Sequence, residues 1–282
     1  MHRIIPKVKS GILFLLALTA LAWSRIEASV AVYPQVLFIN SPNRSVAITV
    51  SNPTETRQEI WVDFRYGYPL VNDSGKFYIN YMDSTAGQEP NAVPWLTAYP
   101  QRFVLNARES QVVRVMAQPP VGLTSGEYWA RVVVNSKQRT AIPPQTPGAN
   151  LRMRMEFISQ VDVPLQVRTG SVNSGVKIHG VTSVVDSGQL KMGIDISRLG
   201  NASFWGTIHL FLRDESGRVM TTHDQHIAIF RDLVYPIIMD VANVPPGSYV
   251  LELDVDNVRP GVPAQYRVKS DAVRFTYQLT VP

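Results

Sequence analysis

Residues 151–168 read LRMRMEFISQVDVPLQVR, and this run alternates between apolar and polar residues along almost its whole length. Eight of the nine odd-numbered residues are apolar, Ser159 being the exception, whereas the even-numbered residues are mostly polar or charged. Because side chains in a β-strand point alternately to the two faces of a sheet, the pattern predicts one long strand with a dry face and a wet face. Strands usually contain about 3–10 residues, so a strand of this length is unusual.

The two halves of this predicted strand lead to different expectations. Residues 161–167 fit an ordinary half-buried strand, but residues 151–157 follow a proline-rich segment, TAIPPQTPG at 140–148, that favours a surface loop. Four large apolar side chains lie on the dry face of this first half: Leu151, Met153, Met155 and Phe157. Burying four such side chains stabilises a complex by about 6–12 kcal/mol before the cost of ordering the segment. An exposed apolar strand of this kind predicts strand donation to another protein chain.

The remainder of the chain predicts an all-β protein. Short runs rich in Val, Ile, Tyr, Phe and Thr recur about every ten residues and are separated by turn residues, which is typical of antiparallel sandwiches. The expected strands of the first domain are 30–39, 45–51, 59–66, 76–81, 102–105, 110–117, 127–135 and 151–168; those of the second are 176–185, 189–197, 204–214, 218–229, 233–241, 248–255 and 273–281. We therefore expect two immunoglobulin-like β-sandwiches, at 29–168 and 176–282, joined by a short hinge at 169–175.

The first 28 residues predict a secretory signal peptide. Basic residues precede an apolar run at 11–23, which is followed by small residues, with cleavage expected after Ala28 or Ala31. The run is too short to span a membrane, which takes about 20 residues, and no other segment approaches that length. Removing the signal lowers the formal charge from +5 to about +2, so no basic footprint for nucleic acid remains. The absence of cysteine excludes thiol chemistry and thiolate metal sites.

Several motifs together resemble those of the periplasmic chaperones of pilus assembly. In order along the chain they are VPWL at 93–96, PQRFVL at 100–105, SQVVRV at 110–115, GEYWAR at 126–131, VDVPLQVR at 161–168, GNASFWG at 200–206 and PPGSY at 245–249. No single motif is diagnostic, but their order and spacing span the whole mature chain. The resemblance is to a divergent member of the family, and it implies that the two sandwiches form an L.

The resemblance implies a periplasmic protein that holds pilus subunits by lending them a strand and delivers them to an outer-membrane usher. In the family, a first-strand Arg and a Lys on the polar side of the donor strand anchor the carboxylate that ends the subunit chain. Here the first-strand position is Gln35, and the Lys position falls on Asp162 or Pro164. Gln35 supplies no charge, so we expect Arg152 or Arg154 to substitute for the missing basic pair, or the client to be held differently. Self-association through the exposed strand is a further expectation.

No constellation for an enzyme is visible in the sequence. The histidines, acids and serines form no triad, metal-ligand spacing or glycine-rich phosphate loop, so we expect no catalytic activity, cofactor or bound metal. The main alternative is an exported structural or adhesive two-domain protein that lacks chaperone activity. An exported hydrolase or sugar-binding module is a weaker alternative, because no convergent set of acids or bases supports it.

Overall fold

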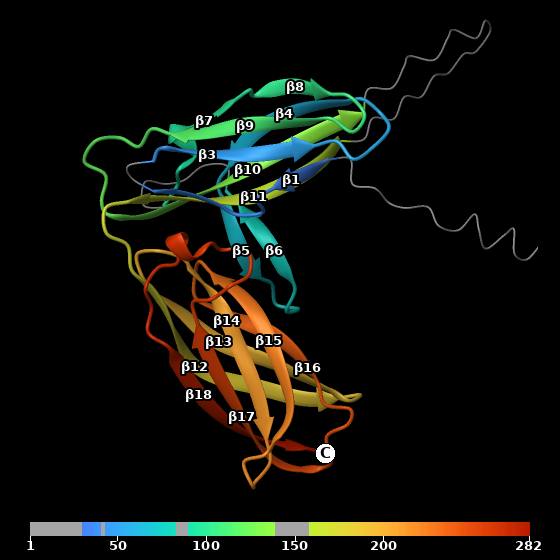
Figure 1. Ribbon diagram of the computed structural model, residues 1–282. Coiled ribbons are helices and arrows are strands. Elements are labelled where there is room, and N and C mark those ends of the chain that lie inside the picture. The colour runs from blue at the N-terminus through green and yellow to red at the C-terminus, as the bar shows by residue number, and fades with distance from the viewer. Residues whose placement is uncertain (1–29, 41–42, 83–89, 139–157) are drawn as a thin grey trace, which may run out of the picture.

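The computed structural model describes residues 30–40, 43–82, 90–138 and 158–282. These residues form two β-sandwiches, one above the other in Figure 1, whose strands run in different directions so that the outline is an L. The predicted all-β architecture is confirmed, with one parallel pair, β2 with β11, among otherwise antiparallel pairs. The two sandwiches are joined at residues 170–173, between the end of β11 and the start of β12.

The first sandwich packs a four-stranded sheet, in the order β1-β3-β9-β7, on a five-stranded sheet, in the order β2-β11-β10-β4-β8. The strands of the four-stranded sheet are β1 (Ala31–Tyr33), β3 (Ser45–Ser51), β7 (Leu96–Tyr99) and β9 (Ser110–Ala117). Those of the five-stranded sheet are β2 (Leu37–Asn40), β4 (Gln58–Arg65), β8 (Arg102–Leu105), β10 (Gly126–Gln138) and β11 (Ile158–Thr169). A 3-10 turn, η1 (Val93–Trp95), precedes β7.

The second sandwich packs a three-stranded sheet, β12-β13-β16, on a four-stranded sheet, β15-β14-β17-β18. Its strands are β12 (Ser174–Asp186), β13 (Gln189–Gly200), β14 (Phe204–Arg213), β15 (Val219–Ile229), β16 (Leu233–Asp240), β17 (Gly247–Asp256) and β18 (Val273–Val281). A second 3-10 turn, η2 (Ala264–Tyr266), lies between β17 and β18. Along each strand every second side chain points inward, and the inward side chains of the two sheets pack together in the core.

A hairpin of β5 (Gly67–Val71) and β6 (Phe77–Tyr81) leaves the first sandwich and extends beside the second, as Figure 1 shows. Its base packs through Tyr66 and Tyr68 into an apolar cluster with Trp129 and Phe230, which belong to different sandwiches. At its far end the ring of Phe77 lies 4.9 Å from that of Tyr235 in the second sandwich. The hairpin therefore joins the two sandwiches along one side.

The first predicted strand, 30–39, is wrong as a single strand. Pro34 interrupts it, and the chain passes from the four-stranded sheet at β1 to the five-stranded sheet at β2. The change of sheet has a local cause, because a proline cannot donate a ladder hydrogen bond.

The predicted wet face of β11 is also wrong at its far end. Gln166 and Arg168 are buried there because the second sandwich covers this face, and Arg168 donates to the backbone oxygen of Tyr266 at 2.6 Å. The opposite face is as predicted: Val163, Leu165 and Val167 are buried in the core of the first sandwich.

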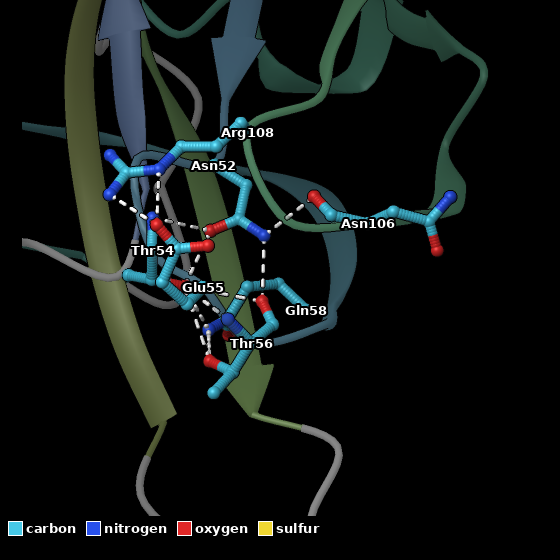
Figure 2. Close-up of polar contacts among 7 residues, drawn as sticks. All are labelled: Asn52, Thr54, Glu55, Thr56, Gln58, Asn106 and Arg108. Carbon is cyan, nitrogen blue, oxygen red and sulfur yellow. Dashed lines mark hydrogen bonds and ion pairs between the residues drawn. The ribbon is translucent and has the colours of Figure 1, made fainter.

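The loop between β3 and β4 is organised by one buried side chain, Asn52, as Figure 2 shows. Its amide donates to the backbone oxygens of Thr56 and Asn106, and its oxygen accepts from the backbone N–H of Thr54. At the rim of this loop Arg108 and Glu55 form an ion pair at 2.7 Å, with both side chains more than half exposed. This loop thus carries an exposed ion pair.

Candidate functional site

Most of the predicted binding residues lie outside the described residues: Leu151, Met153, Met155, Phe157, Arg152 and Arg154. The described part of the strand begins directly after them at Ile158, whose side chain is 56% exposed. From Ile158 the chain continues as regular β11, and its register with β10 holds for all twelve residues.

Strand β11 lies at an open edge over the first part of its length. On one side β10 pairs with it from Ile158 to Thr169, whereas on the other side β2 pairs only with residues 165–168. No strand in the described part of the chain pairs with residues 158–164 on that second side. Main-chain groups on that side can therefore form ladder hydrogen bonds with a strand of another chain.

A cleft between the two sandwiches lies beside this strand. It contains a cavity of about 250 Å³, closed on one side by the β5–β6 hairpin through Pro69 and Ile79. The first sandwich contributes Gln35, Arg131 and Pro164 to its wall. The second sandwich contributes aromatic and loop residues: Trp205, Ala228, Phe230 and the turn 259–262. The cleft thus brings two sequence-predicted anchor positions, Gln35 and Pro164, to one place.

The second sandwich places a cation, Arg259, in this cleft, and no sequence pattern indicated it. The Arg259 guanidinium lies over the ring of Trp205 at 4.7 Å and donates to the backbone oxygen of Ile227 at 2.9 Å. Burial lowers the pKa of Arg259, but an arginine starts so far above neutrality that it stays charged. No carboxylate in the described part of the chain pairs with it, so Arg259 can bind an anion that enters the cleft.

The second missed cation, Arg131, is already neutralised. Its Nε donates to Asp162, which also accepts a hydrogen bond from the hydroxyl of Tyr81 on the hairpin. Arg65 lies over the Tyr81 ring at 3.8 Å. Burial raises the pKa of the Asp162 carboxyl to about 6, against the opposing charge of Arg65, and lowers the pKa of Arg131 to about 10. Asp162 therefore joins β11 to the hairpin and does not leave Arg131 free for a ligand.

A buried ion pair sets the angle between the two walls of the cleft. Glu127 on β10 is fully buried and accepts from Arg168 Nε at 2.9 Å and from Trp129 Nε1 at 2.9 Å. It also accepts from the backbone N–H of Ser203 in the second sandwich at 3.0 Å, and from the Ser203 hydroxyl. Because one carboxylate binds groups of both sandwiches, it fixes how the sandwiches meet.

Stacked rings reinforce this joint. Phe38 of β2 stacks on Tyr266 of the second sandwich, with centroids 5.0 Å apart, and its edge contacts Trp205. Phe230 in turn contacts both Trp205 and Trp129. These contacts make the cleft a preformed feature of the chain.

Arg131 and Arg259 differ in how far the sequence alone could have placed them. Arg131 has the same parity as Trp129 on β10, so it could have been placed on the face that leaves the core. Arg259 lies in an irregular turn before Pro260 and Gly261, where no periodicity points to a neighbour. Only the three-dimensional arrangement brings Arg259 to the same cavity as Gln35.

Two features are absent from the residues that the structure describes. In the residues that the structure describes, no three His, Asp or Glu side chains are grouped so that they could hold a metal ion. Across the same residues, no helix has the length and apolar character that crossing a bilayer requires.

Comparison with known proteins gave matches among solved structures only. No protein-family model matches the sequence, and no curated protein matches it. The solved structures include the CsuC–CsuE chaperone and tip-adhesin pre-assembly complex of archaic Csu pili from Acinetobacter baumannii, with a TM-score of 0.42 and 11% identity over 88% of this chain and 98% of that chain. They also include the class 5 fimbriae chaperone CfaA, with a TM-score of 0.40 and 14% identity over 90% of this chain and 99% of that chain. The YadV chaperone has a TM-score of 0.40 and 11% identity, over 89% of this chain and all of that chain.

Proposed function

We propose that the protein is an exported chaperone of the periplasm that binds pilus subunits by donating a strand to them before their assembly at the outer membrane. The donated strand consists of residues 151–157 continued by the open edge of β11, and the signal peptide at 1–28 directs export. The observation that carries the proposal is the edge of residues 158–164, which no strand among the described residues pairs with and which directly follows the predicted apolar run. An outer-membrane usher is the partner that would receive the subunit.

Strand donation explains why an aggregation-prone edge is retained. A bound subunit would gain main-chain hydrogen bonds along 151–164, and Leu151, Met153, Met155 and Phe157 would fill its apolar groove. The main-chain bonds give affinity that depends little on sequence, whereas the alternate side chains give specificity. The protein needs no cofactor or catalytic group for this activity.

The cleft beside the strand supplies the anchor for the end of the subunit. Arg259 is the cation of the second sandwich in the cavity, and Gln35 can donate a hydrogen bond from the opposite wall. Arg152 and Arg154 are the remaining candidates for binding a carboxylate, on the polar side of the donated strand. Replacing Arg259 with Gln should weaken subunit binding without unfolding the chaperone, because only one backbone hydrogen bond and one ring contact are lost.

Capture of subunits from the periplasm tests the proposal. The tagged chain is produced together with the pilus subunits of its own host and purified from the periplasm. The wild type should co-purify with one subunit per chaperone chain. Met153→Glu should lose the subunit, because a charge cannot enter an apolar groove without a large desolvation cost.

The matched control is Val121→Glu, which makes the same apolar-to-acidic change at a fully exposed loop residue. It should retain the subunit. A wild type that retains no subunit, or a Met153→Glu variant that retains as much as Val121→Glu, would favour the structural or adhesive alternative.

A further inference from the structure

Arg131 is a buried cation whose outer nitrogens have no partner. Its side chain is 9% exposed, and its Nε donates to Asp162 on β11. The two terminal nitrogens, Nη1 and Nη2, form no hydrogen bond with any residue that the structure describes. Arg131 also lines the cleft cavity of about 250 Å³. A guanidinium offers five donors in a planar fork, so most of the binding capacity of Arg131 is unused at the wall of this cavity.

Asp162 is the internal partner of Arg131, and it lies among several charged or titratable groups. Those of the first sandwich and the hairpin are Arg131 on β10, Tyr81 on β6, and Arg65 and Asp63 on β4. Tyr81 donates to Asp162, Arg65 lies over the Tyr81 ring, and Asp63 lies in the same row of the sheet as Asp162, on the far side of β10. From the second sandwich, Arg259 lines the same cavity as Arg131.

A carboxylate that bound the outer nitrogens of Arg131 would lie near the carboxylate of Asp162. Two carboxylates that share one site repel each other, and one of them then takes up a proton more easily. Burial already raises the pKa of the Asp162 carboxyl to about 6, while the charge of Arg65 opposes this shift. A proton on Asp162 therefore removes the charge that holds Arg131, at a pH not far from neutrality.

The chemistry of the cavity fits the end of a polypeptide. Its volume of about 250 Å³ lies below the roughly 300–1,000 Å³ of pockets that hold small-molecule ligands, so it admits about one residue. Pro69, Ile79 and Phe230 provide apolar walls for a side chain, and the arginines provide positive charge for a terminal carboxylate. A terminal residue with an apolar side chain meets both conditions.

We propose that Arg131 is a second binding residue for the carboxylate that ends a bound polypeptide, and that Asp162 controls whether Arg131 is available. An ionised Asp162 keeps the guanidinium to itself, so that Arg259 receives the carboxylate without help from Arg131. A protonated Asp162 releases the guanidinium, and one arginine from each sandwich then binds the same carboxylate. This inference rests on the proposed function for the nature of the ligand and deepens it by making subunit anchoring depend on pH.

Binding of a short peptide to the purified chain tests the proposal. The probe is acetyl-Ala-Val-Phe with a free terminal carboxylate, and fluorescence of Trp205, which lines the cavity, reports its binding. With a pKa of about 6, the neutral fraction of Asp162 is roughly 0.03 at pH 7.5 and roughly 0.9 at pH 5, so the affinity of the wild type should rise about thirtyfold between them. The same peptide with a terminal amide should bind at least about tenfold more weakly at pH 5. Acetate should also bind at least about tenfold more weakly, because it leaves the apolar walls uncovered.

Two variants separate Arg131 from Asp162. Asp162→Asn should bind the peptide at about pH 7.5 within about threefold of the wild type at about pH 5, with no further change with pH. Adding Arg131→Gln to Asp162→Asn should weaken binding at least about tenfold, because hydrogen bonds to a charged group are lost. This double variant leaves no unpaired charge of the pair buried, so its fold should be retained. The control Asp63→Asn makes the same change at an exposed acid on the same face and should keep the pH profile of the wild type.

Several results would overturn the proposal. A pH dependence that persists in Asp162→Asn would assign the effect to another group, such as a histidine. Equal affinities with and without Arg131→Gln would remove Arg131 from the site, and equal binding of the acid and the amide would remove the carboxylate. Acetate that binds as well as the peptide would show that the site takes free carboxylates. Strand donation is tested separately by subunit capture with Met153→Glu, so the failure of either proposal can be recognised by itself.

Discussion

Replacing Glu127 with Gln should destabilise the protein far more than its small change in shape suggests. The substitution keeps the size of the side chain but removes the charge that neutralises Arg168, and it turns an amide N–H₂ toward Arg168 Nε in place of an oxygen 2.9 Å away. The Gln carbonyl can still accept from Trp129 and Ser203, so those bonds need not be lost. Breaking one side of a buried ion pair costs about 3–5 kcal/mol, and we expect Glu127→Gln to fall at the lower end of that range.

Urea unfolding followed by tryptophan fluorescence measures this effect, because Trp129 and Trp205 lie at the joint. The exposed pair Glu55–Arg108 is the matched control, and Glu55→Gln should lower the free energy of unfolding by less than about 1 kcal/mol. The double variant Glu127→Gln with Arg168→Met should regain much of the loss, because no unpaired charge then stays buried. Equal losses in Glu127→Gln and Glu55→Gln would refute the role given to the joint.

Three further changes test other parts of the structure. Gln166→Met should raise the unfolding temperature, because both polar atoms of the buried Gln166 amide lack a hydrogen-bond partner among the described residues. A lower unfolding temperature would show that the amide is satisfied. Burial raises the pKa of Asp162 to about 6, so the contribution of Asp162 to stability is present in full below about pH 4 and is lost as the pH rises through 6. The free energy of unfolding of the wild type, relative to that of Asp162→Asn, should therefore fall between about pH 4 and pH 6. A difference that does not change with pH would contradict the raised pKa. Hydrogen bonding to Asp224 raises the pKa of His209. The free energy of unfolding of the wild type, relative to that of His209→Gln, should therefore be greatest below about pH 6.5 and decline above it. A difference that grows with pH would contradict this prediction.

The sequence predicted those parts of the fold that depend on local alternation. The odd-numbered residues of β11 from Val163 to Val167 lie in the core because a period of two places them on one face whatever covers the other. The break at Pro34 had a visible local cause, but the predicted strand crossed it. Strand β5 was missed because Gly67 and Pro69 within it are turn residues by composition.

The parts that could not be predicted depend on contacts between the two sandwiches. Arg168 and Gln166 belong to a polar face by sequence, and only the approach of Tyr266, far along the chain, buries Arg168 and its neighbour. Arg259 reaches the cleft from an irregular turn, so its position depends on the fold of the second sandwich and not on any pattern near it. The residues that shape the cleft therefore required the structure, whereas the strand beside it did not.

Hydrogen–deuterium exchange on the purified complex of this chain with a captured pilus subunit tests strand donation most directly. Peptides that cover residues 151–164 should exchange at least about tenfold more slowly in the complex than in the free chain, because their main-chain N–H groups gain ladder partners. Peptides from β17, which is paired on both sides by β14 and β18, should not change. Equal exchange of residues 151–164 in the free and bound chain would show that the subunit is held by some other surface.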